Sequence, residues 1–319
     1  MNIQDIQKTA HSIRDNINKI IIGKEDTIDF LLTAIISGGH VLLEDVPGTG
    51  KTMLAKSLAK SIDGDFSRIQ FTPDLLPSDI TGLNIFNQGS HSFEFVPGPV
   101  FTNILLADEI NRATPRTQSS LLECMEEKQV TVDGNTRSLD TPFLVIATQN
   151  PIETAGTFNL PEAQLDRFMM QLSMGLPSKS EELQIMDRFI NDNPLTSINP
   201  VCSKDDIYIM GEAAKSIFVH PVVRQYIADI VIATRNDKSI SSGVSPRGTL
   251  ALLKSSQVYA AIHGREFVTP DDVKKLAVPV LAHRIISYTN NTKNSGKASL
   301  IQNVIESVTA PTEDWAKSQ

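Results

Sequence analysis

One short segment, residues 41–52, limits the folds open to this chain more than any other part of it. An apolar run, Val41–Leu43, predicts a strand, a loop with two glycines follows, and Met53–Ser61 has a helical pattern. Strand, glycine loop and helix form the setting in which Gly-Lys-Thr binds phosphate groups. Glycine lets backbone amides turn toward the phosphates, and the helix N-terminus adds the positive end of its dipole. The segment therefore predicts a nucleotide-binding site.

The residues of this loop have distinct expected roles. The Lys51 ammonium group is expected to bind the β- and γ-phosphates of ATP, and the Thr52 hydroxyl group is expected to bind Mg²⁺. The strict pattern begins with a further glycine, and Asp45 stands in its place. Because Asp45 precedes the tight turn, we expect nucleotide binding to survive this departure. The loop residues expected around ATP are Val46, Pro47, Gly48, Thr49, Gly50, Lys51, Thr52 and Met53.

A second apolar strand ends in two carboxylates. Residues 103–107 read Asn-Ile-Leu-Leu-Ala, and Asp108 and Glu109 follow directly. Such an apolar run is typical of a buried parallel strand, whose carboxyl end lies at the ligand-binding edge of the sheet. We expect Asp108 to bind Mg²⁺, directly or through water, and Glu109 to polarise the water that attacks the γ-phosphate. The presence of Glu109 argues against a regulatory nucleotide switch with negligible hydrolysis.

Two polar residues complete the expected catalytic set. Asn150 follows an apolar strand predicted at 143–148, and it is expected to orient the attacking water beside the γ-phosphate. Arg167 lies at the end of a short helix predicted at 162–166. An arginine there can reach the nucleotide of a neighbouring subunit, where known arginine fingers raise the rate by about 10³–10⁵. That role for Arg167 rests mainly on family resemblance.

Composition and charge are those of a globular protein. The 319 residues are 40% apolar and 21% charged, and the chain is long enough for two domains with sizeable cores. No apolar stretch approaches 18 residues, and the N-terminus lacks the apolar core of a signal peptide, so no membrane span is expected. Two cysteines without metal-ligand spacing suggest a reducing cytoplasm. The net charge of −8 argues against a mainly electrostatic nucleic-acid binder.

The pattern of the chain changes near residue 178. Residues 1–178 alternate apolar strands with helices, which predicts an α/β domain whose parallel sheet is covered on both faces. Residues 179–319 show helical periodicity only, so a helical domain is expected there. The expected strands are 40–44, 66–72, 103–107, 143–148 and 168–173, and the later helices are 181–191, 204–216, 221–236, 246–263 and 270–283.

Two insertions interrupt the α/β domain. A hairpin is predicted at about 128–140, where strand-forming residues flank Asp133-Gly134. The other insertion, at about 73–100, is expected to hold a short helix and then a hairpin around residues 88–90. Long loops are either functional or disordered, and the phenylalanines of this one argue against disorder.

Together these motifs resemble the MoxR family of AAA+ ATPases over about residues 16–284. The resemblance implies a P-loop αβα core with a C-terminal helical lid. It also implies a homo-oligomer, a ring of six subunits with ATP at each interface. The most specific stretches are residues 68–79, 98–101, 107–127 and 148–168.

The resemblance also implies roles for single residues. Arg247 matches the family's sensor 2, which reaches the γ-phosphate in cis. At a helix N-terminus an arginine is otherwise unfavourable, and that misfit favours an anionic partner. Ile22 and Gly23 match the linker that lines the adenine pocket. The insertions match the helix-2 insert and the pre-sensor-1 hairpin, which face the pore or the substrate. Walker A, Walker B, sensor 1 and the finger fall on residues 48–52, Asp108–Glu109, Asn150 and Arg167.

The client is implied by the resemblance alone. MoxR-type ATPases are chaperone-like and help partner proteins, often with von Willebrand factor A domains, to assemble or take up metal cofactors. A nucleic-acid motor is the competing class, because related hairpins occur in DNA helicases. Here Lys128 and Arg137 are outnumbered by nearby acidic residues, which disfavours contact with phosphates.

Overall fold

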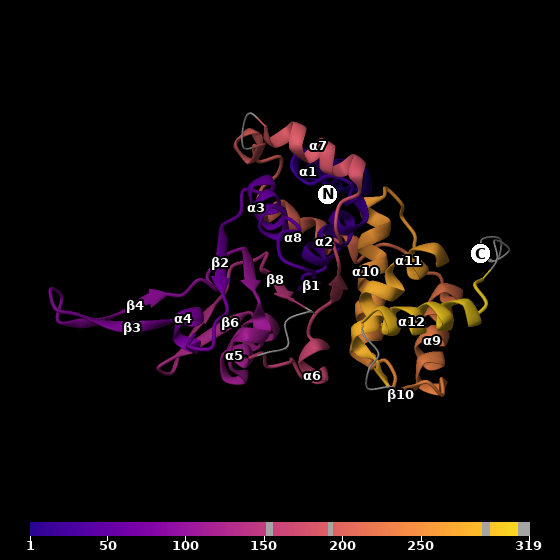
Figure 1. The fold of residues 1–319 in the computed structure, drawn as a ribbon. Helices are drawn as coiled ribbons and strands as arrows, with labels where there is room; N and C mark the ends of the chain where they lie inside the picture. Colours follow the sequence, from indigo (N-terminus) through magenta and orange to yellow (C-terminus); the bar gives the residue numbers. More distant parts are fainter. Residues whose placement is uncertain (151–155, 191–193, 289–293, 312–319) are drawn as a thin grey trace.

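A five-stranded parallel sheet forms the centre of the structure (Figure 1), a computed structural model that describes residues 1–150, 156–190, 194–288 and 294–311. The strand order is β2-β5-β8-β1-β9, and every neighbouring pair is parallel. All five predicted strands are confirmed. Their bounds are Val41–Glu44 for β1, Phe66–Gln70 for β2, Ile104–Asp108 for β5, Leu144–Gln149 for β8 and Met170–Leu172 for β9.

Alternate side chains of the central strands pack on opposite faces of the sheet. In β5, Ile104 and Leu106 join one apolar cluster, and Leu105 and Ala107 join the other. The first cluster includes residues of α1 (Ile3–Asn18), α2 (Glu25–Ile36) and α3 (Lys51–Ser61), and the second includes residues of α5 (Pro115–Glu127). Because both faces are buried, these strands can be apolar throughout.

The helices predicted after residue 178 are present. Ser245 and Thr269 cap two of them by accepting hydrogen bonds from the amides of Gly248 and Asp272, as the Ser-Pro and Thr-Pro pairs indicate. The predicted end of one helix, Asn191, lies outside the described residues. The bounds are Lys179–Phe189 for α7, Lys204–Ala214 for α8, Pro221–Asn236 for α9, Pro246–Ile262 for α10 and Pro270–Leu281 for α11.

Two features of the helical part differ from the expectation. A small antiparallel pair joins β10 (Ile240–Ser242) to β11 (Ile286–Ser287). Strands of two or three residues are too short to show alternation in a sequence. Beyond the expected helices lies a further one, α12 (Asn294–Ser307), which packs on α9 and α11 (Figure 1).

One apolar cluster spans both parts of the chain. It runs from α1, α2 and α3 into α8, α9, α10 and α11. No separate core therefore marks the boundary expected at residue 178, and that boundary stays a prediction.

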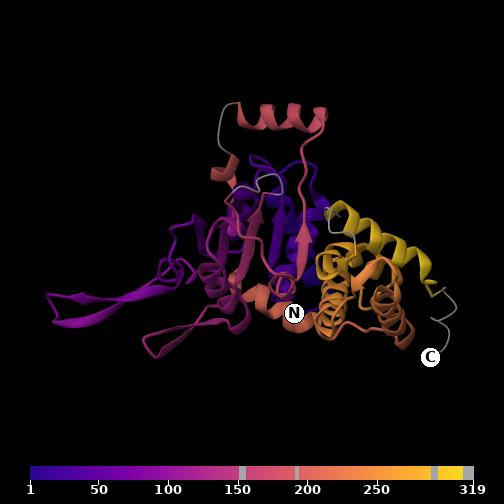
Figure 2. The ribbon, with the colours of Figure 1, turned by 60° about the horizontal axis from the view of Figure 1, so that its bottom comes forward.

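Both predicted hairpins are present, and one extends far from the body (Figure 2). The Asn84 amide on the long hairpin donates to Asp133 Oδ2 on the other at 2.7 Å. The Arg137 guanidinium group lies 3.8 Å from the centre of the Phe95 ring. The turn region of the shorter hairpin therefore lies against the long hairpin near the base of the latter. Their elements are α4 (Pro77–Thr81), β3 (Gly82–Asn87), β4 (Ser92–Pro97), β6 (Gln129–Val132) and β7 (Asn135–Ser138).

Candidate nucleotide-binding site

The glycine loop between β1 and α3 lines a cavity of about 400 Å³ at the carboxyl edge of the sheet. Gly48 and Gly50 have φ angles of +86° and +89°, the left-handed region that favours glycine. A Cβ atom on Gly48 would meet nothing within 4 Å, so the backbone conformation, and not a lack of space, requires glycine there. The lining residues are Asp45, Pro47, Gly48, Gly50, Lys51, Thr52, Met53, Arg68, Gln70, Asp108, Glu109, Thr148, Gln149 and Asn150.

Lys51 begins α3 and turns its ammonium group back over the loop. Its Nζ donates to the backbone oxygens of Asp45 and Val46, at 3.0 and 3.1 Å. Thr49 Oγ1 donates to the same Val46 oxygen at 3.4 Å. These bonds hold the ammonium group at the wall of the cavity, beside the backbone amides of the loop.

Asp45, the departure from the general loop pattern, has a structural role. The residue is buried, and its carboxylate accepts hydrogen bonds from Ser173 Oγ at 2.7 Å, from the Met174 amide at 2.7 Å and from the Gly175 amide at 3.0 Å. Those residues directly follow β9, the neighbour of β1. Asp45 therefore ties the loop to the adjacent strand, which a glycine could not do.

Asp108 and Glu109 meet the loop in the same cavity. One hydroxyl group fixes both, because Thr148 Oγ1 donates to Asp108 Oδ1 at 2.6 Å and accepts from the Glu109 amide at 2.8 Å. Glu109 has φ +55° and ψ +51°. A left-handed conformation is uncommon for glutamate, and residues held in such conformations cluster at functional sites.

The sequence analysis gave no role to four residues that line this site: Arg68, Gln70, Thr148 and Gln149. Arg68 Nη2 donates to Asp108 Oδ2 at 2.6 Å, and Gln70 Nε2 donates to Glu109 Oε2 at 2.9 Å. In the parallel pairing of β2 with β5, Gln70 lies opposite Asp108. The available signal was the alternation Arg-Ile-Gln at the end of β2, which places the two polar residues on one face.

The remaining expected residues divide into two groups. Asn150 follows β8 and lines the cavity with the loop. Four other expected residues are not among the lining residues: Ile22, Gly23, Val46 and Thr49. Gly23 packs against α7, since a Cβ atom on it would lie 1.6 Å from Glu181 Oε1. Ile21 approaches the loop instead, with its Cδ1 3.7 Å from the place of a Cβ on Gly50. The adenine-side role of Ile22 and Gly23 stays a prediction.

Thr52 and Asp108 fit the metal expected with a bound nucleotide. They place a hydroxyl and a carboxylate oxygen on one cavity, and Mg²⁺ is usually held by one or two protein carboxylates together with phosphates and water. Within the described ranges, no group of three or more His, Cys, Asp or Glu side chains could hold a metal. Both cysteines are free, and burial raises the pKa of the Cys124 and Cys202 thiols to about 12.

Arg167 and Arg247 lie together, away from this cavity. Arg167 follows α6 (Glu162–Leu165) and precedes β9, so it lies at the amino edge of the parallel sheet, opposite the glycine loop. Its Nε is 3.2 Å from Glu126 Oε2. Arg247, in the first turn of α10, pairs with the other oxygen of that carboxylate.

The position expected for Arg247 therefore needs correction. The resemblance implied a cis contact with the γ-phosphate, but the structure does not bring Arg247 to the glycine loop of its own chain. The reason is the packing of the lid: α10 contacts α1 and α2, and its N-terminus meets Glu126. The sensor 2 motif identifies Arg247 in the sequence, but it does not determine how the lid packs against the α/β domain.

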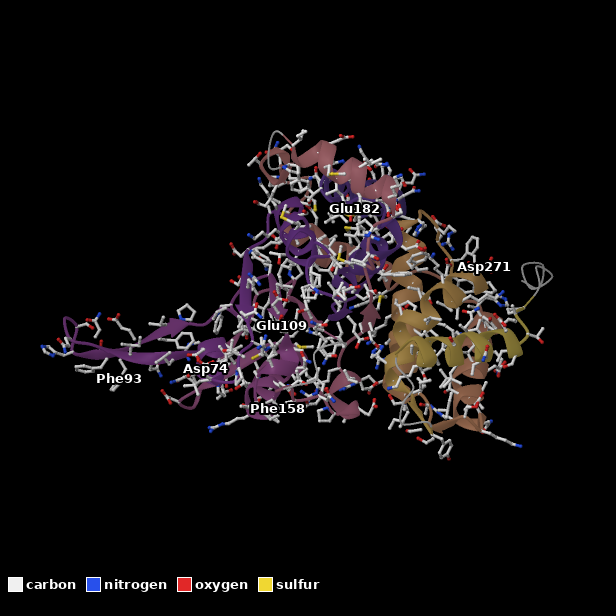
Figure 3. The ribbon with its side chains drawn as sticks, in the orientation of Figure 1. Asp74, Phe93, Glu109, Phe158, Glu182 and Asp271 are labelled. Atoms are coloured by element: carbon white, nitrogen blue, oxygen red, sulfur yellow. The ribbon has the colours of Figure 1, made fainter. Side chains whose placement is uncertain are left out.

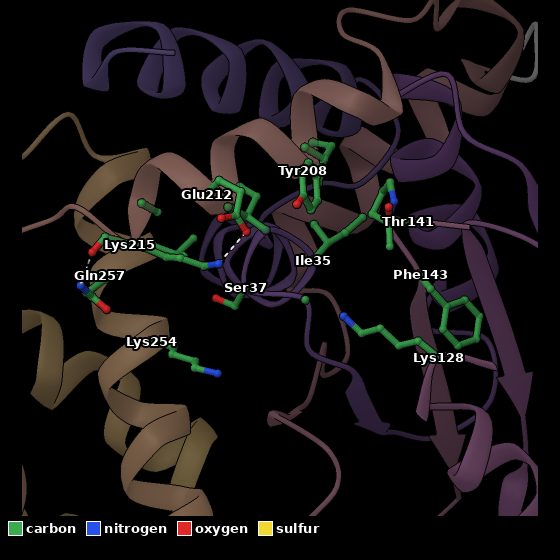
Figure 4. A pocket seen from close by; sticks show the side chains of 17 residues that line it. Ile35, Ser37, Lys128, Thr141, Phe143, Tyr208, Glu212, Lys215, Lys254 and Gln257 are labelled. Atoms are coloured by element: carbon green, nitrogen blue, oxygen red, sulfur yellow. Dashed lines mark hydrogen bonds and ion pairs between the residues drawn. The ribbon is translucent and has the colours of Figure 1, made fainter. Parts of the chain in front are cut away.

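A second cavity, of about 260 Å³, lies at the amino edge of the sheet. Lys128, Lys215 and Lys254 line it, together with apolar side chains that include Ile35 and Phe143 (Figure 4). Lys215 Nζ is 2.6 Å from Glu212 Oε1. None of the residues expected around ATP lines this cavity.

Comparisons with known proteins agree with the geometry. Residues 40–170 match the model of the ATPase family associated with various cellular activities (AAA), and residues 232–304 match that of the AAA lid domain. The chain is 39% identical to chaperone MoxR1 of Mycobacterium tuberculosis, over 92% of this chain and 80% of that protein. This chain belongs to the MoxR family of AAA+ ATPases.

Two further similarities cover nearly the whole chain. The uncharacterized protein YeaC of Bacillus subtilis is 46% identical over 97% of each chain. A crystal structure of a proposed ATPase from Cytophaga hutchinsonii has a TM-score of 0.90 at 39% identity, again over 97% of each chain. These matches confirm the predicted α/β fold with its helical lid. Among the described residues, no helix is long and apolar enough to cross a membrane.

Proposed function

We propose that this MoxR-family protein binds ATP with Mg²⁺ and hydrolyses the γ-phosphate. The observation that carries the proposal is one cavity lined by Lys51, Thr52, Asp108, Glu109 and Asn150. These residues come from three separate segments of the sequence, each at the carboxyl end of a parallel strand. A phosphate loop, oxygen ligands for a metal and a carboxylate near the attacking water are the parts that phosphoryl transfer to water requires.

Each residue of the cavity has a separate role in ATP hydrolysis. The loop amides and Lys51 bind the phosphates, and Thr52 and Asp108 hold Mg²⁺, which offsets the negative charge of the transferring phosphoryl group. Glu109 orients a water molecule and accepts its proton as the water attacks phosphorus. Asn150 holds that water in line with the bond that breaks.

The active form is a ring of subunits, six in number as the MoxR resemblance implies. Arg167 and Arg247 lie at the amino edge of the sheet, away from the glycine loop of their own chain. We therefore assign both to the nucleotide of the neighbouring subunit. Guanidinium groups there stabilise the charge that develops on the transferring phosphoryl group.

Hydrolysis drives a chaperone-like action on a partner protein. One support is the long β3–β4 hairpin, which extends from the body and leaves the Phe93 side chain 72% exposed (Figure 3). The other is the printed name of a relative, chaperone MoxR1. A partner with a von Willebrand factor A domain, a role in assembly or metal-cofactor insertion, and a cytoplasmic location complete the proposal on the strength of the family resemblance.

Glu109 separates ATP binding from hydrolysis. The Glu109→Gln side chain keeps the size of the parent but cannot accept a proton, so phosphate release should fall by about 10²-fold or more. Calorimetry should show ATP binding equal to that of the parent. Glu266→Gln, which changes an exposed glutamate outside this cavity and outside the one that Arg167 lines, should hydrolyse ATP like the parent. Unchanged phosphate release by Glu109→Gln would reject Glu109 as the base.

A further inference from the structure

One carboxylate holds both arginines that the proposed function assigns to the subunit interface. Glu126 lies in the last turn of α5, and its Oε2 is 3.2 Å from Arg167 Nε. Its Oε1 accepts a hydrogen bond from Arg247 Nη2. The side chains of Arg167, Glu126 and Arg247 are 32%, 35% and 46% exposed. The cluster is therefore anchored on one side and open to a neighbouring molecule on the other.

Arg247 has an unfavourable position without this partner, and Arg167 is held beside the same carboxylate. Arg247 lies in the first turn of α10, where the helix dipole disfavours a cation. Arg167 Nη1 donates to the Leu122 backbone oxygen at 2.8 Å, which points its guanidinium group along α5 toward the same place. Two guanidinium groups brought to one point repel each other, and a carboxylate between them offsets that repulsion. Glu126 thus sets the spacing of two like charges.

Asp166 ties the same two segments together next to the arginines. Its Oδ2 accepts a hydrogen bond from the Ser245 hydroxyl at 3.3 Å, and Ser245 is the cap of α10. Its Oδ1 and its backbone oxygen both accept from Nη1 of the buried Arg284, the latter at 2.9 Å. The segment before β9 and the start of α10 are therefore joined next to Arg167 and Arg247.

We propose that Glu126 is a positioning residue, which holds Arg167 and Arg247 side by side so that both reach the same nucleotide on the neighbouring subunit. The inference rests on the proposed ring-forming ATPase. It adds that the two arginines form one anion-binding unit and that Glu126 holds this unit together. The surface of each subunit that carries Arg167 and Arg247 is called the finger side. Glu126 itself does not touch the nucleotide of its own chain, because it lies at the opposite edge of the sheet from the glycine loop.

Loss of this carboxylate should therefore impair turnover and leave ATP binding intact. In Glu126→Ala, turnover at saturating ATP should fall by about 10²-fold, the loss expected when catalytic groups are displaced by about 1 Å. Calorimetry with the hydrolysis-deficient background Glu109→Gln should show an ATP affinity unchanged by Glu126→Ala. The control is Glu266→Ala, which removes an exposed carboxylate outside the cavity that Glu126 and Arg167 line and should hydrolyse ATP like the parent.

Mixed rings test on which side of the interface Glu126 acts. Glu126→Ala and Arg167→Ala subunits both keep an intact loop, whereas Lys51→Ala subunits keep an intact finger side. Equimolar Glu126→Ala with Lys51→Ala should recover ATPase activity, as should Arg167→Ala with Lys51→Ala. Equimolar Glu126→Ala with Arg167→Ala should recover none, because the two variants lack the same side of each interface.

The outcomes distinguish failure of this inference from failure of the proposed ring-forming ATPase function. If Arg167→Ala with Lys51→Ala recovers no activity, the shared-site ring is wrong and the inference fails with it. If that mixture recovers activity, parent-like turnover of Glu126→Ala overturns the inference alone. Two other results would also overturn it: recovery of ATPase activity when Glu126→Ala is mixed with Arg167→Ala, or no recovery when Glu126→Ala is mixed with Lys51→Ala. Should Glu126→Ala fail to fold in a thermal melt, Glu126→Gln, which keeps the shape and removes the charge, replaces it in the same mixtures with the same expected results.

Discussion

The carboxylate of Asp45 accepts a hydrogen bond of 2.7 Å from the backbone amide of Met174, and this contact joins the glycine loop to the strand beside it. The same carboxylate accepts from Ser173 Oγ and from the Gly175 amide. A buried carboxylate with three donors is satisfied, so the negative charge costs little where it stands. The shape of the phosphate loop therefore depends on a residue that the general motif does not contain.

Asp45→Asn should destabilise the protein. Its amide oxygen can still accept from Ser173 and Gly175, but its NH₂ group then faces the Met174 amide, which is also a donor. A buried donor left without an acceptor costs about 1–3 kcal/mol of unfolding free energy. Urea unfolding of parent and variant measures this loss. Ser173→Ala, which removes a single hydrogen bond to the same carboxylate, should cost less. Equal stability of parent and Asp45→Asn would show that the contact does not secure the loop.

Stability should also fall with acid because of His40. Burial lowers the pKa of His40 to about 4, and its ring bonds to the Met125 oxygen and the Val145 amide. Below about pH 6.5 the His40 ring binds a proton in the unfolded chain but not in the folded protein. The contribution of His40 to stability is therefore complete above pH 6.5 and declines toward pH 4. The complete loss is roughly 3 kcal/mol, from a shift of about 2.5 pKa units.

Unfolding free energies between pH 7 and pH 4.5 check this dependence. The parent should lose more stability over that range than His40→Gln, in which residue 40 no longer titrates. His11→Gln changes an exposed histidine and should follow the parent. A constant difference between the parent and His40→Gln at every pH would exclude His40 as the source.

The sheet and the centre of the site could be predicted because buried strands have a clear apolar pattern in the sequence. The strands β1, β5 and β8 are buried on both faces, so each is an uninterrupted apolar run. In a parallel sheet the polar residues after such runs gather at one edge, which is why Lys51, Asp108 and Asn150 could be placed together.

The rest depends on contacts between distant segments. The partners Arg68 and Gln70 come from the edge strand β2, whose mixed residues resemble any exposed strand. The place of Arg247 depends on how α10 packs beside α1 and α2. No local pattern encodes that packing. The bond from Asp45 to Met174 spans 129 positions along the chain, so the sequence showed the departure from the motif but not its purpose.

The exposed face of the long hairpin predicts a protein contact. Phe86 and Phe93 pair across β3 and β4 with their ring centres 5.4 Å apart, and both remain substantially exposed. Exposed apolar patches mark sites of interaction. The double variant Phe86→Ser with Phe93→Ser should lose most of the ability to suppress aggregation of heated citrate synthase, measured by light scattering in the presence of ATP. ATP hydrolysis without added protein, which depends on the distant cavity, should stay at the parent level. Full suppression by the variant would remove the hairpin from the partner surface.

DNA should not stimulate ATP hydrolysis. The net charge of −8 creates a field that repels a polyanion. The β6–β7 hairpin, which corresponds to the hairpins found in DNA helicases, carries Asp133 at its turn, bonded to Asn84. Arg137, one of its two cations, stacks on Phe95 and so is not free to follow a phosphate backbone. Non-specific DNA binding requires lysines and arginines to displace counterions and is strongest at low salt, near 50 mM. Phosphate release should therefore be the same with and without single- or double-stranded DNA at that salt concentration. A several-fold stimulation that disappears as salt is raised would replace the protein-remodelling function with that of a nucleic-acid motor.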